Sequence, residues 1–223
     1  MFNTLKKCIA FIVAAITMFC VVMAPSTANA LEYKIVEFSC DTDVSITVVD
    51  NTMSEDLTMD EVPLFNQMDY PDVPYGGNSV ATSGCGITCI AMIGSYLRDE
   101  AILPDELAKM FNDCKYSNIQ RMEQASDYLE LPYEKTTSWN TVYEALQNGQ
   151  VAISYQSGGI FTGGGHLIVL TGVNEDGKVM VNDPYGYNWR KNAEMIDGFA
   201  NGFTKSQVDS NCSMYWIYEA KKD

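Results

Sequence analysis

Hydrophobic positions in the first half of the chain follow the period of an α-helix. From Ile87 to Leu97 apolar residues recur at the spacing of a buried helix, which ends near Arg98. Pro104 and the acidic residues after it are typical of a second helix start. Further helices are predicted over 103–113, 119–129 and 139–148, the last between a capping Ser138 and Gly149.

After Gly149 the pattern changes to short runs that are rich in β-branched and aromatic residues. Such runs predict strands over 151–155, 166–172, 178–183 and 212–218. Helices come first and strands second, without the alternation that builds a parallel sheet. The sequence therefore predicts an α+β fold in which a helical layer packs on an antiparallel sheet.

The first 30 residues have the pattern of a secretory signal. Lys6 and Lys7 precede an apolar run over 8–24, and small residues stand at Ala28 and Ala30. We expect cleavage after Ala30, which would make the protein secreted or exposed at the cell surface. An uncleaved membrane anchor is the alternative, because the run approaches the length of a membrane span.

The mature chain is long enough for one well-buried domain. Residues 31–62 hold two alternating runs, 33–38 and 44–49, followed by an acidic stretch. We expect strands and a linker here, or a short propeptide. Residues 63–223 form the predicted main domain.

Charge and cysteine content limit the possible partners. The chain has 14 basic and 29 acidic residues, a net charge of −15, which disfavours nucleic acid and anionic lipid. We expect no nucleic-acid partner, and membrane contact only through the signal segment. The five cysteines after the signal are Cys40, Cys85, Cys89, Cys114 and Cys212. Their odd number indicates that at least one thiol stays outside disulfides, and their spacing assigns no pairing.

Cys85 is the first candidate for chemistry. It lies between Gly84 and Gly86 at the start of the predicted helix. Free N–H groups and the positive end of the helix dipole at this place favour a thiolate. The alternative is a buried or disulfide-bonded cysteine, and Cys89, one turn later, is expected to be buried.

His166 is the second candidate, since it is the single histidine of the chain. It follows a glycine-rich loop that contains Gly164 and Gly165, where an imidazole at a strand edge would leave room for a substrate backbone. No Lys-Ser or Lys-Thr pair follows these glycines, so a phosphate-binding loop is a poor interpretation.

The third candidate follows from the hairpin that His166 begins. A two-residue loop at 175–176 would place His166 opposite Tyr185 and put Asp183 beside it on the same face. A carboxylate there would orient the imidazole. A loop of odd length would bring Asn182 to that face instead.

Three motifs, "GCGITCIAM", "GHLIVLTGV" and "VMVNDPYG", occur in this order. Together they resemble papain-like cysteine peptidases related to the domains that remove double-glycine leaders from bacteriocins, including secreted stand-alone relatives. The resemblance covers about residues 63–190 and points to a bacterial source. It implies Cys85 as nucleophile, His166 as base and Asp183 as the residue that orients it. It also implies that Gln67 donates to the oxyanion.

The predicted activity is hydrolysis of peptide bonds through a thioester, without cofactor or metal. The residues expected to line the substrate cleft are Gly84, Gly164, Gly165, Tyr185 and Trp189. Three alternatives stay open. They are a non-catalytic binding or adhesion module, a transpeptidase or cell-wall amidase, and a zinc site made by Cys85, Cys89, His166 and Asp183.

Overall fold

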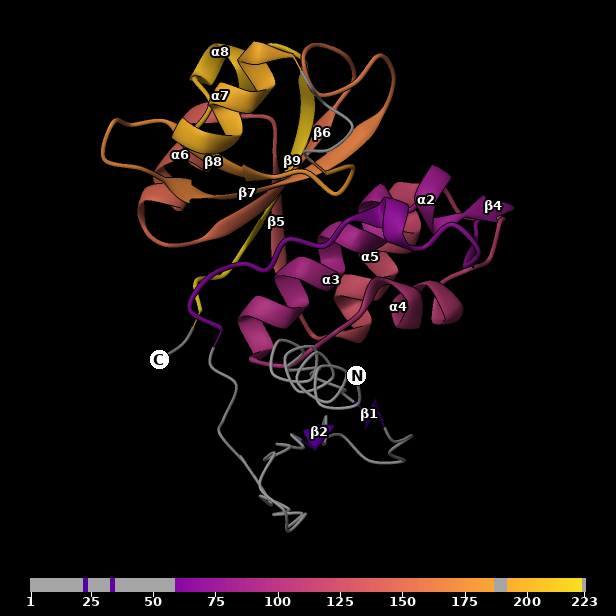
Figure 1. Ribbon diagram of the computed structural model, residues 1–223. Coiled ribbons are helices and arrows are strands. Elements are labelled where there is room, and N and C mark those ends of the chain that lie inside the picture. Colours follow the sequence, from indigo (N-terminus) through magenta and orange to yellow (C-terminus); the bar gives the residue numbers. More distant parts are fainter. Residues whose placement is uncertain (1–21, 24–32, 35–58, 187–191, 222–223) are drawn as a thin grey trace, which may run out of the picture. The chain divides into compact units, whose positions relative to one another are not determined.

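The computed structural model describes residues 22–23, 33–34, 59–186 and 192–221 (Figure 1). The chain divides into two units, 1–55 and 56–223. In the first unit the antiparallel strands β1 (Val22–Met23) and β2 (Tyr33–Lys34) are described. Of the strands predicted over 33–38 and 44–49, only residues 33–34 are described, and the rest lies outside the described residues. Within the described ranges, no helix combines the length and apolarity needed to cross a membrane.

The second unit is built on a five-stranded antiparallel sheet with the order β5-β9-β6-β7-β8. Its strands are β5 (Tyr133–Thr136), β6 (Val151–Gln156), β7 (His166–Val173), β8 (Val179–Asn182) and β9 (Cys212–Tyr218). Four of these strands agree with the sequence-based prediction. β5, at one edge of the sheet, is additional.

Helices cover both faces of this sheet (Figure 1). One lobe contains α2 (Val80–Ser83), α3 (Cys85–Arg98), α4 (Pro104–Met110) and α5 (Asn118–Tyr128). The short elements η1 (Gln67–Asp69), β3 (Pro74–Tyr75) and β4 (Asn78–Ser79) precede these helices. The opposite face carries α6 (Trp139–Gln147), α7 (Ala193–Asn201) and α8 (Lys205–Asp209). The predicted α+β class with a helical layer on an antiparallel sheet is confirmed.

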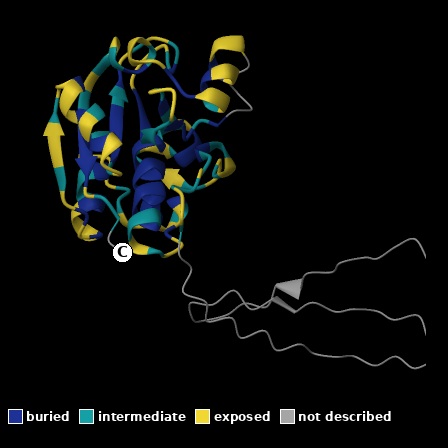
Figure 2. Ribbon diagram, turned by 90° about the vertical axis from the view of Figure 1, so that its left-hand side faces the viewer, coloured by how far each residue is buried: buried dark blue, intermediate teal, exposed yellow. Residues whose placement is uncertain are grey.

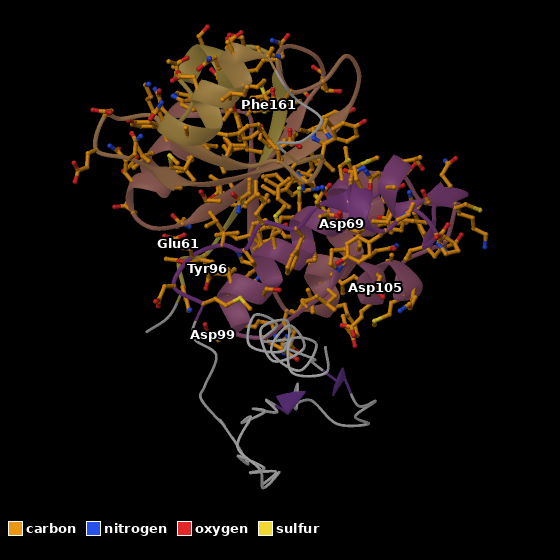
Figure 3. All side chains as sticks on the ribbon, viewed as in Figure 1. Glu61, Asp69, Tyr96, Asp99, Asp105 and Phe161 are labelled. Carbon is orange, nitrogen blue, oxygen red and sulfur yellow. The ribbon has the colours of Figure 1, made fainter. Side chains whose placement is uncertain are left out.

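The sheet separates two hydrophobic cores, because successive side chains of a strand point to opposite faces. Leu167 and Val169 of β7 belong to the core under α3. Ile168 and Leu170 belong to the core under α6 to α8, where Figure 3 shows Phe161. Figure 2 shows how the buried residues gather in this interior. Burial on both faces explains why the central strands are continuously apolar.

The ends of the second unit meet at the C-terminus of α3. Asp99 accepts hydrogen bonds from the backbone N–H of Met59 and from the Lys221 ammonium, which also donates to the Met59 carbonyl at 2.7 Å. Lys221 also lies 5.3 Å from the centre of the Tyr96 ring. Figure 3 shows Tyr96 and Asp99 at this end of α3. The chain is therefore fixed to the domain from Met59 onward.

The β7–β8 hairpin differs from the prediction in its loop. Val173 pairs with Val179, and the backbone N–H of Asn174 donates to Lys178, so the turn spans residues 175–177. The predicted two-residue loop is therefore wrong. The physical reason is the Asn174 side chain, which accepts from the N–H groups of Asp176 and Lys178 and closes a longer turn.

A second irregularity offsets the longer turn. The register shifts between Leu170 and Gly172, which leaves Thr171 as the extra residue of a bulge. Beyond the bulge Val169 pairs with Asn182, which is the pairing that a two-residue loop would have given. The odd loop alone would have reversed the faces of β8. With the bulge, Asp183 returns to the face of His166.

Candidate active site

Cys85 is the first residue of α3 and is 8% exposed. Gly84 connects α2 to α3, and a Cβ at this position would lie 2.5 Å from the carbonyl oxygen of Val80. The tight junction therefore requires glycine, and it sets the direction in which Cys85 enters its helix. The N–H groups of the first turn have no partners within the helix, so the thiol sits at its electropositive end.

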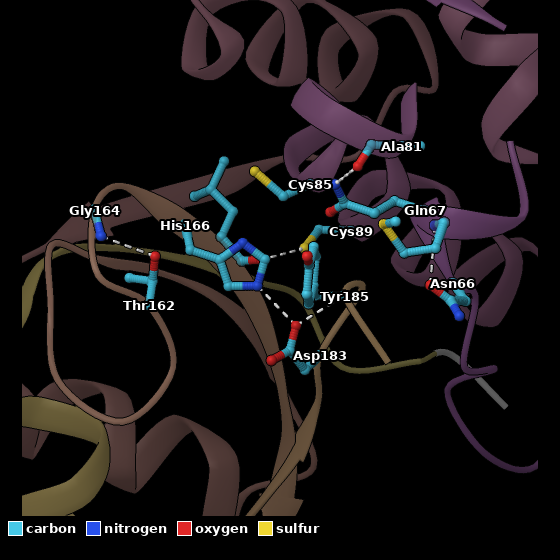
Figure 4. A network of polar contacts seen from close by, with 12 residues as sticks. Asn66, Gln67, Ala81, Cys85, Cys89, Thr162, Gly164, His166, Asp183 and Tyr185 are labelled. Atoms are coloured by element: carbon cyan, nitrogen blue, oxygen red, sulfur yellow. Dashed lines mark hydrogen bonds and ion pairs between the residues drawn. The ribbon is translucent and has the colours of Figure 1, made fainter. Parts of the chain in front are cut away.

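His166 and Asp183 form the second part of the site. His166 is the first residue of β7, and its Nε2 lies 2.7 Å from Oδ1 of Asp183. The same oxygen accepts the backbone N–H of Tyr185 at 2.8 Å. Both side chains are buried. Figure 4 shows the other ring nitrogen, Nδ1, on the side of Cys85, so the imidazole lies between thiol and carboxylate.

Asn182 points away from this histidine. Its side-chain amide donates to the carbonyl oxygens of Val62 and Pro63, at 2.9 and 3.2 Å. These bonds hold the segment that leads to Gln67. The structure thus brings Asp183, and not Asn182, to the imidazole.

Interactions within the site shift the ionisation of both partners. Burial acts to raise the pKa of the Cys85 thiol, but hydrogen bonding and charge interaction with His166 outweigh it, helped by the Leu167 backbone and Asn118, so that the pKa is lowered. Burial acts to lower the pKa of His166, yet Asp183 and Cys85 raise it to about 9. The two shifts favour a thiolate beside an imidazolium.

Cys89 shows the opposite behaviour. It is fully buried one turn after Cys85, and its thiol donates to the carbonyl oxygen of Leu167 at 3.4 Å. Burial, with the nearby Cys85 and Asp183, raises its pKa well above the usual thiol range. Cys89 is therefore a buried thiol, as the sequence predicts. Cys85, Cys89, Cys114 and Cys212, which all lie in the described ranges, are free.

Gln67 is the first residue of η1, and its side chain lies beside Cys85 (Figure 4). Its Nε2 donates to the carbonyl oxygen of Ala81 at 2.7 Å and lies 3.4 Å from that of Val80. Its backbone N–H donates to Pro184 at 2.7 Å, which ties it to the strand end that carries Asp183. The amide is thus held against α2, and its donation to an oxyanion stays a prediction.

The predicted cleft residues have different surroundings. Gly164 is exposed, and a Cβ added there would have no heavy atom of another residue within 4 Å. A Cβ added at Gly165 would lie 2.6 Å from the hydroxyl of Tyr155, so this glycine lies close to that side chain. Tyr185 meets His166 edge to face, with ring centres 6.4 Å apart. Trp189 lies outside the described residues. Of these positions, Gly164 has open space above it.

Asn118 is a site residue that the sequence analysis missed. It is the first residue of α5, and its Nδ2 donates to Sγ of Cys85 at 3.0 Å. The only signal in the sequence is its place next to the helix cap Ser117, which says nothing about a neighbour 33 residues earlier. Among the described residues, no three histidine, cysteine or acidic side chains are grouped to hold a metal ion.

The geometry described above belongs to a thiol enzyme of papain-like fold. The model of the Peptidase_C39 like family matches residues 59–209, so the chain belongs to this family and is a cysteine peptidase. A solved structure with a similar fold is the peptidase domain of Streptococcus ComA, a bi-functional ABC transporter involved in a quorum sensing pathway. The two share 14% identity over 72% of this chain and 99% of that domain, with a TM-score of 0.50. No curated protein matches the chain.

Proposed function

We propose that this cysteine peptidase hydrolyses peptide bonds with Cys85 as nucleophile, His166 as acid and base, and Asp183 as the residue that orients the imidazole. The observation that carries the proposal is the position of His166. Its Nε2 is bonded to Asp183 at 2.7 Å, which leaves Nδ1 for the thiol. A carboxylate in this place fixes the tautomer and stabilises the imidazolium.

Acylation begins with attack of the Cys85 thiolate on the carbonyl carbon of the substrate. A carbon–sulfur bond forms, and the negative charge moves to the carbonyl oxygen. The backbone N–H of Cys85 and the Gln67 amide, which would exchange its 3.4 Å bond to Val80 for one to the substrate, are the proposed donors to this oxygen. The His166 imidazolium then gives its proton to the leaving nitrogen, the carbon–nitrogen bond breaks, and a thioester remains.

Deacylation uses the same histidine as a base. His166, now neutral, takes a proton from water, and the resulting hydroxide attacks the thioester carbonyl. The carbon–sulfur bond breaks, the acid product leaves, and the thiolate returns beside the imidazolium. No cofactor enters either half of the reaction.

The substrate we propose is a peptide or protein outside the cell. Residues 1–30 would direct export and be removed after Ala30. The open space at Gly164 gives room for an extended backbone next to His166, with Gly165 and Tyr185 on the adjoining walls. Gly84 and Trp189 are proposed for the same cleft from their places in the sequence, next to Cys85 and after Tyr185.

The pH dependence of kcat/KM should show an alkaline limb near pH 9. The pKa of His166 is raised to about 9 by Asp183 and Cys85, so the imidazolium persists up to that pH and is lost above it. An unpaired histidine would lose its proton near pH 6.5. Initial rates on a peptide substrate between pH 5 and 10 measure the limb. A fall already at pH 6.5 to 7 would contradict the ion pair.

The reactivity of the thiol tests the proposal directly. At pH 6 we expect iodoacetamide to modify the buried Cys85 about tenfold faster than the exposed Cys114, since the thiolate is the reacting form. His166→Ala should remove this advantage. Peptide mass spectrometry gives both rates in one sample, with Cys114 as the internal control. Equal alkylation rates of Cys85 and Cys114 in the wild-type protein would contradict the catalytic role of Cys85.

A further inference from the structure

Asn118 has a place in the site that the triad leaves unexplained. Its side-chain Nδ2 lies 3.0 Å from Sγ of Cys85, on the helical lobe, whereas His166 belongs to the sheet. Resting on the proposed role of Cys85, we propose that Asn118 is a further catalytic residue. Its amide donates a hydrogen bond to the sulfur and holds it as a thiolate positioned for attack.

The orientation of the Asn118 amide is set by its neighbours. Oδ1 lies 3.3 Å from the hydroxyl of Tyr75, which can donate to it, so the NH₂ group faces the sulfur. A thiolate can only accept, which matches this orientation. A neutral thiol could also donate a hydrogen bond, so the amide oxygen of Asn118 would suit it equally well as a partner. The arrangement therefore selects the charged form of Cys85.

Arg121 lies over the ring of Tyr75. Its guanidinium carbon is 4.4 Å from the ring centre. A guanidinium can donate but cannot accept, so the phenol proton is left for Asn118. Burial raises the pKa of Tyr75 to about 12 against the opposing effect of Arg121, which keeps that proton in place.

Backbone carbonyls hold Arg121 in this network. Arg121 is buried, and it donates to the backbone carbonyls of Asp113 and Tyr116 in the loop before α5. Gly86 provides the space, because a Cβ at this position would lie 2.9 Å from Oδ1 of Asn118 and 3.0 Å from the Leu167 side chain. The glycine after the cysteine thus has a structural reason that involves Asn118.

The ionisable groups around Cys85 come from several elements. His166 of β7, backed by Asp183, faces the sulfur from the sheet, and Cys89 lies one turn further along α3. Tyr75 of β3 and Arg121 of α5 lie behind Asn118. His166 favours the thiolate through its charge, and it loses its proton during the reaction. Asn118 keeps its protons at every pH and continues to stabilise the thiolate.

The experiment replaces the donor by an isosteric acceptor in the full-length chain. In Asn118→Asp the carboxylate cannot donate and repels the thiolate, while an acidic residue in the first turn favours α5. We expect the iodoacetamide reaction of Cys85 at pH 6 to slow about tenfold, with the whole rate profile between pH 5 and 10 moved to higher pH. Asn118→Ala should act in the same direction, and Tyr75→Phe should have a smaller effect.

Asn112→Asp is the matched control. It introduces the same charge on the same lobe, but the Asn112 side chain uses Oδ1 to accept from Gly76 at 2.7 Å, which a carboxylate also does. This variant should keep the profile of the unmodified protein. A general effect of negative charge, which would slow both aspartate variants equally, would overturn the proposal.

His166→Ala separates the two levels of the argument. If it slows alkylation while Asn118→Asp and Asn118→Ala react like the unmodified protein, the triad stands and the role of Asn118 is wrong. If His166→Ala also leaves the rate unchanged, the proposed function fails, and this inference with it. If the Asn118 variants lost hydrolysis but kept the alkylation profile of the wild-type protein, Asn118 would act on the substrate. That result would likewise overturn its proposed action on the thiolate.

Discussion

Asp183→Asn should lower turnover by about four orders of magnitude while leaving the protein folded. The amide can bond to the imidazole in the wrong tautomer and cannot balance the charge of the imidazolium. In the structure one oxygen, Oδ1, serves both His166 at 2.7 Å and the backbone of Tyr185 at 2.8 Å. The measurement is kcat on a peptide substrate, with circular dichroism to verify the fold.

The adjacent Asn182→Ala is the control for this experiment. Its side chain faces away from His166 and holds the carbonyls of Val62 and Pro63. Removal of the Asn182 amide should lower the free energy of unfolding by about 1 to 2 kcal/mol and change turnover by less than about threefold. If Asn182→Ala proved more damaging to turnover than Asp183→Asn, the register of β8 given by the structure would be one residue off.

Cys85→Ala should abolish peptide hydrolysis, with a loss of at least about 10⁴-fold. The sulfur is the atom that forms the thioester, and the neighbouring thiol of Cys89 is fully buried with a raised pKa. The fold should persist, since the change removes one atom from a small side chain. Cleavage of a fluorogenic peptide pool measures the effect.

Cys89→Ala provides the matched comparison, because the same substitution is made one turn later in the same helix. This thiol is fully buried, donates to Leu167 and has a raised pKa, for which burial is the main cause. We expect a loss of about 1 kcal/mol in stability and activity within about threefold. Equal loss of activity in both variants would point to damage of α3 and would remove the argument for Cys85.

Much of the fold is predictable because local pattern and tertiary structure agree. α6 begins after Ser138, which accepts from Thr141 at 3.3 Å, and ends before Gly149, which has a φ of 77°. The strands β6, β7 and β9 stand where continuous apolar runs predict them, since both faces of the sheet are covered. Helices α7 and α8 and the edge strand β5 were missed. α8 has five residues and β5 has four, mostly polar or charged, so no period emerges there. α7 has nine residues, as many as α6, and its capping Asn192 was not weighed as a helix start.

The candidate site is predictable where chemistry leaves a mark in the sequence. A cysteine between glycines and a lone histidine after a glycine-rich loop are visible as patterns. The pairing of His166 with Asp183 was predicted correctly, although by an incomplete route, because the loop is longer and a bulge compensates for it. Hydrogen bonds of Asn174 to its own turn decided that loop, and pattern reasoning does not weigh them.

Asn118 was not predictable, because its contact depends on tertiary packing. α5 must cross α3 at the height of Cys85, and Gly86 must leave room for the amide. The residues around position 118 indicate neither of these two conditions. An asparagine at the start of a helix is common for reasons of capping alone, so its presence gives no reason to look for a sulfur nearby.

The paired irregularities of the β7–β8 hairpin have a consequence for how such hairpins change over time. One added residue in the turn and one in the strand restore the same facing of Asp183, so the two insertions are neutral together although either one alone would present Asn182. Relatives can therefore differ in hairpin length by matched steps and still keep the acid beside the histidine. When such sequences are aligned, the residues between the histidine and the acid should be counted and each bulge residue subtracted. Whether this corrected number is odd or even decides which side chain faces the histidine, whereas the total number of residues does not.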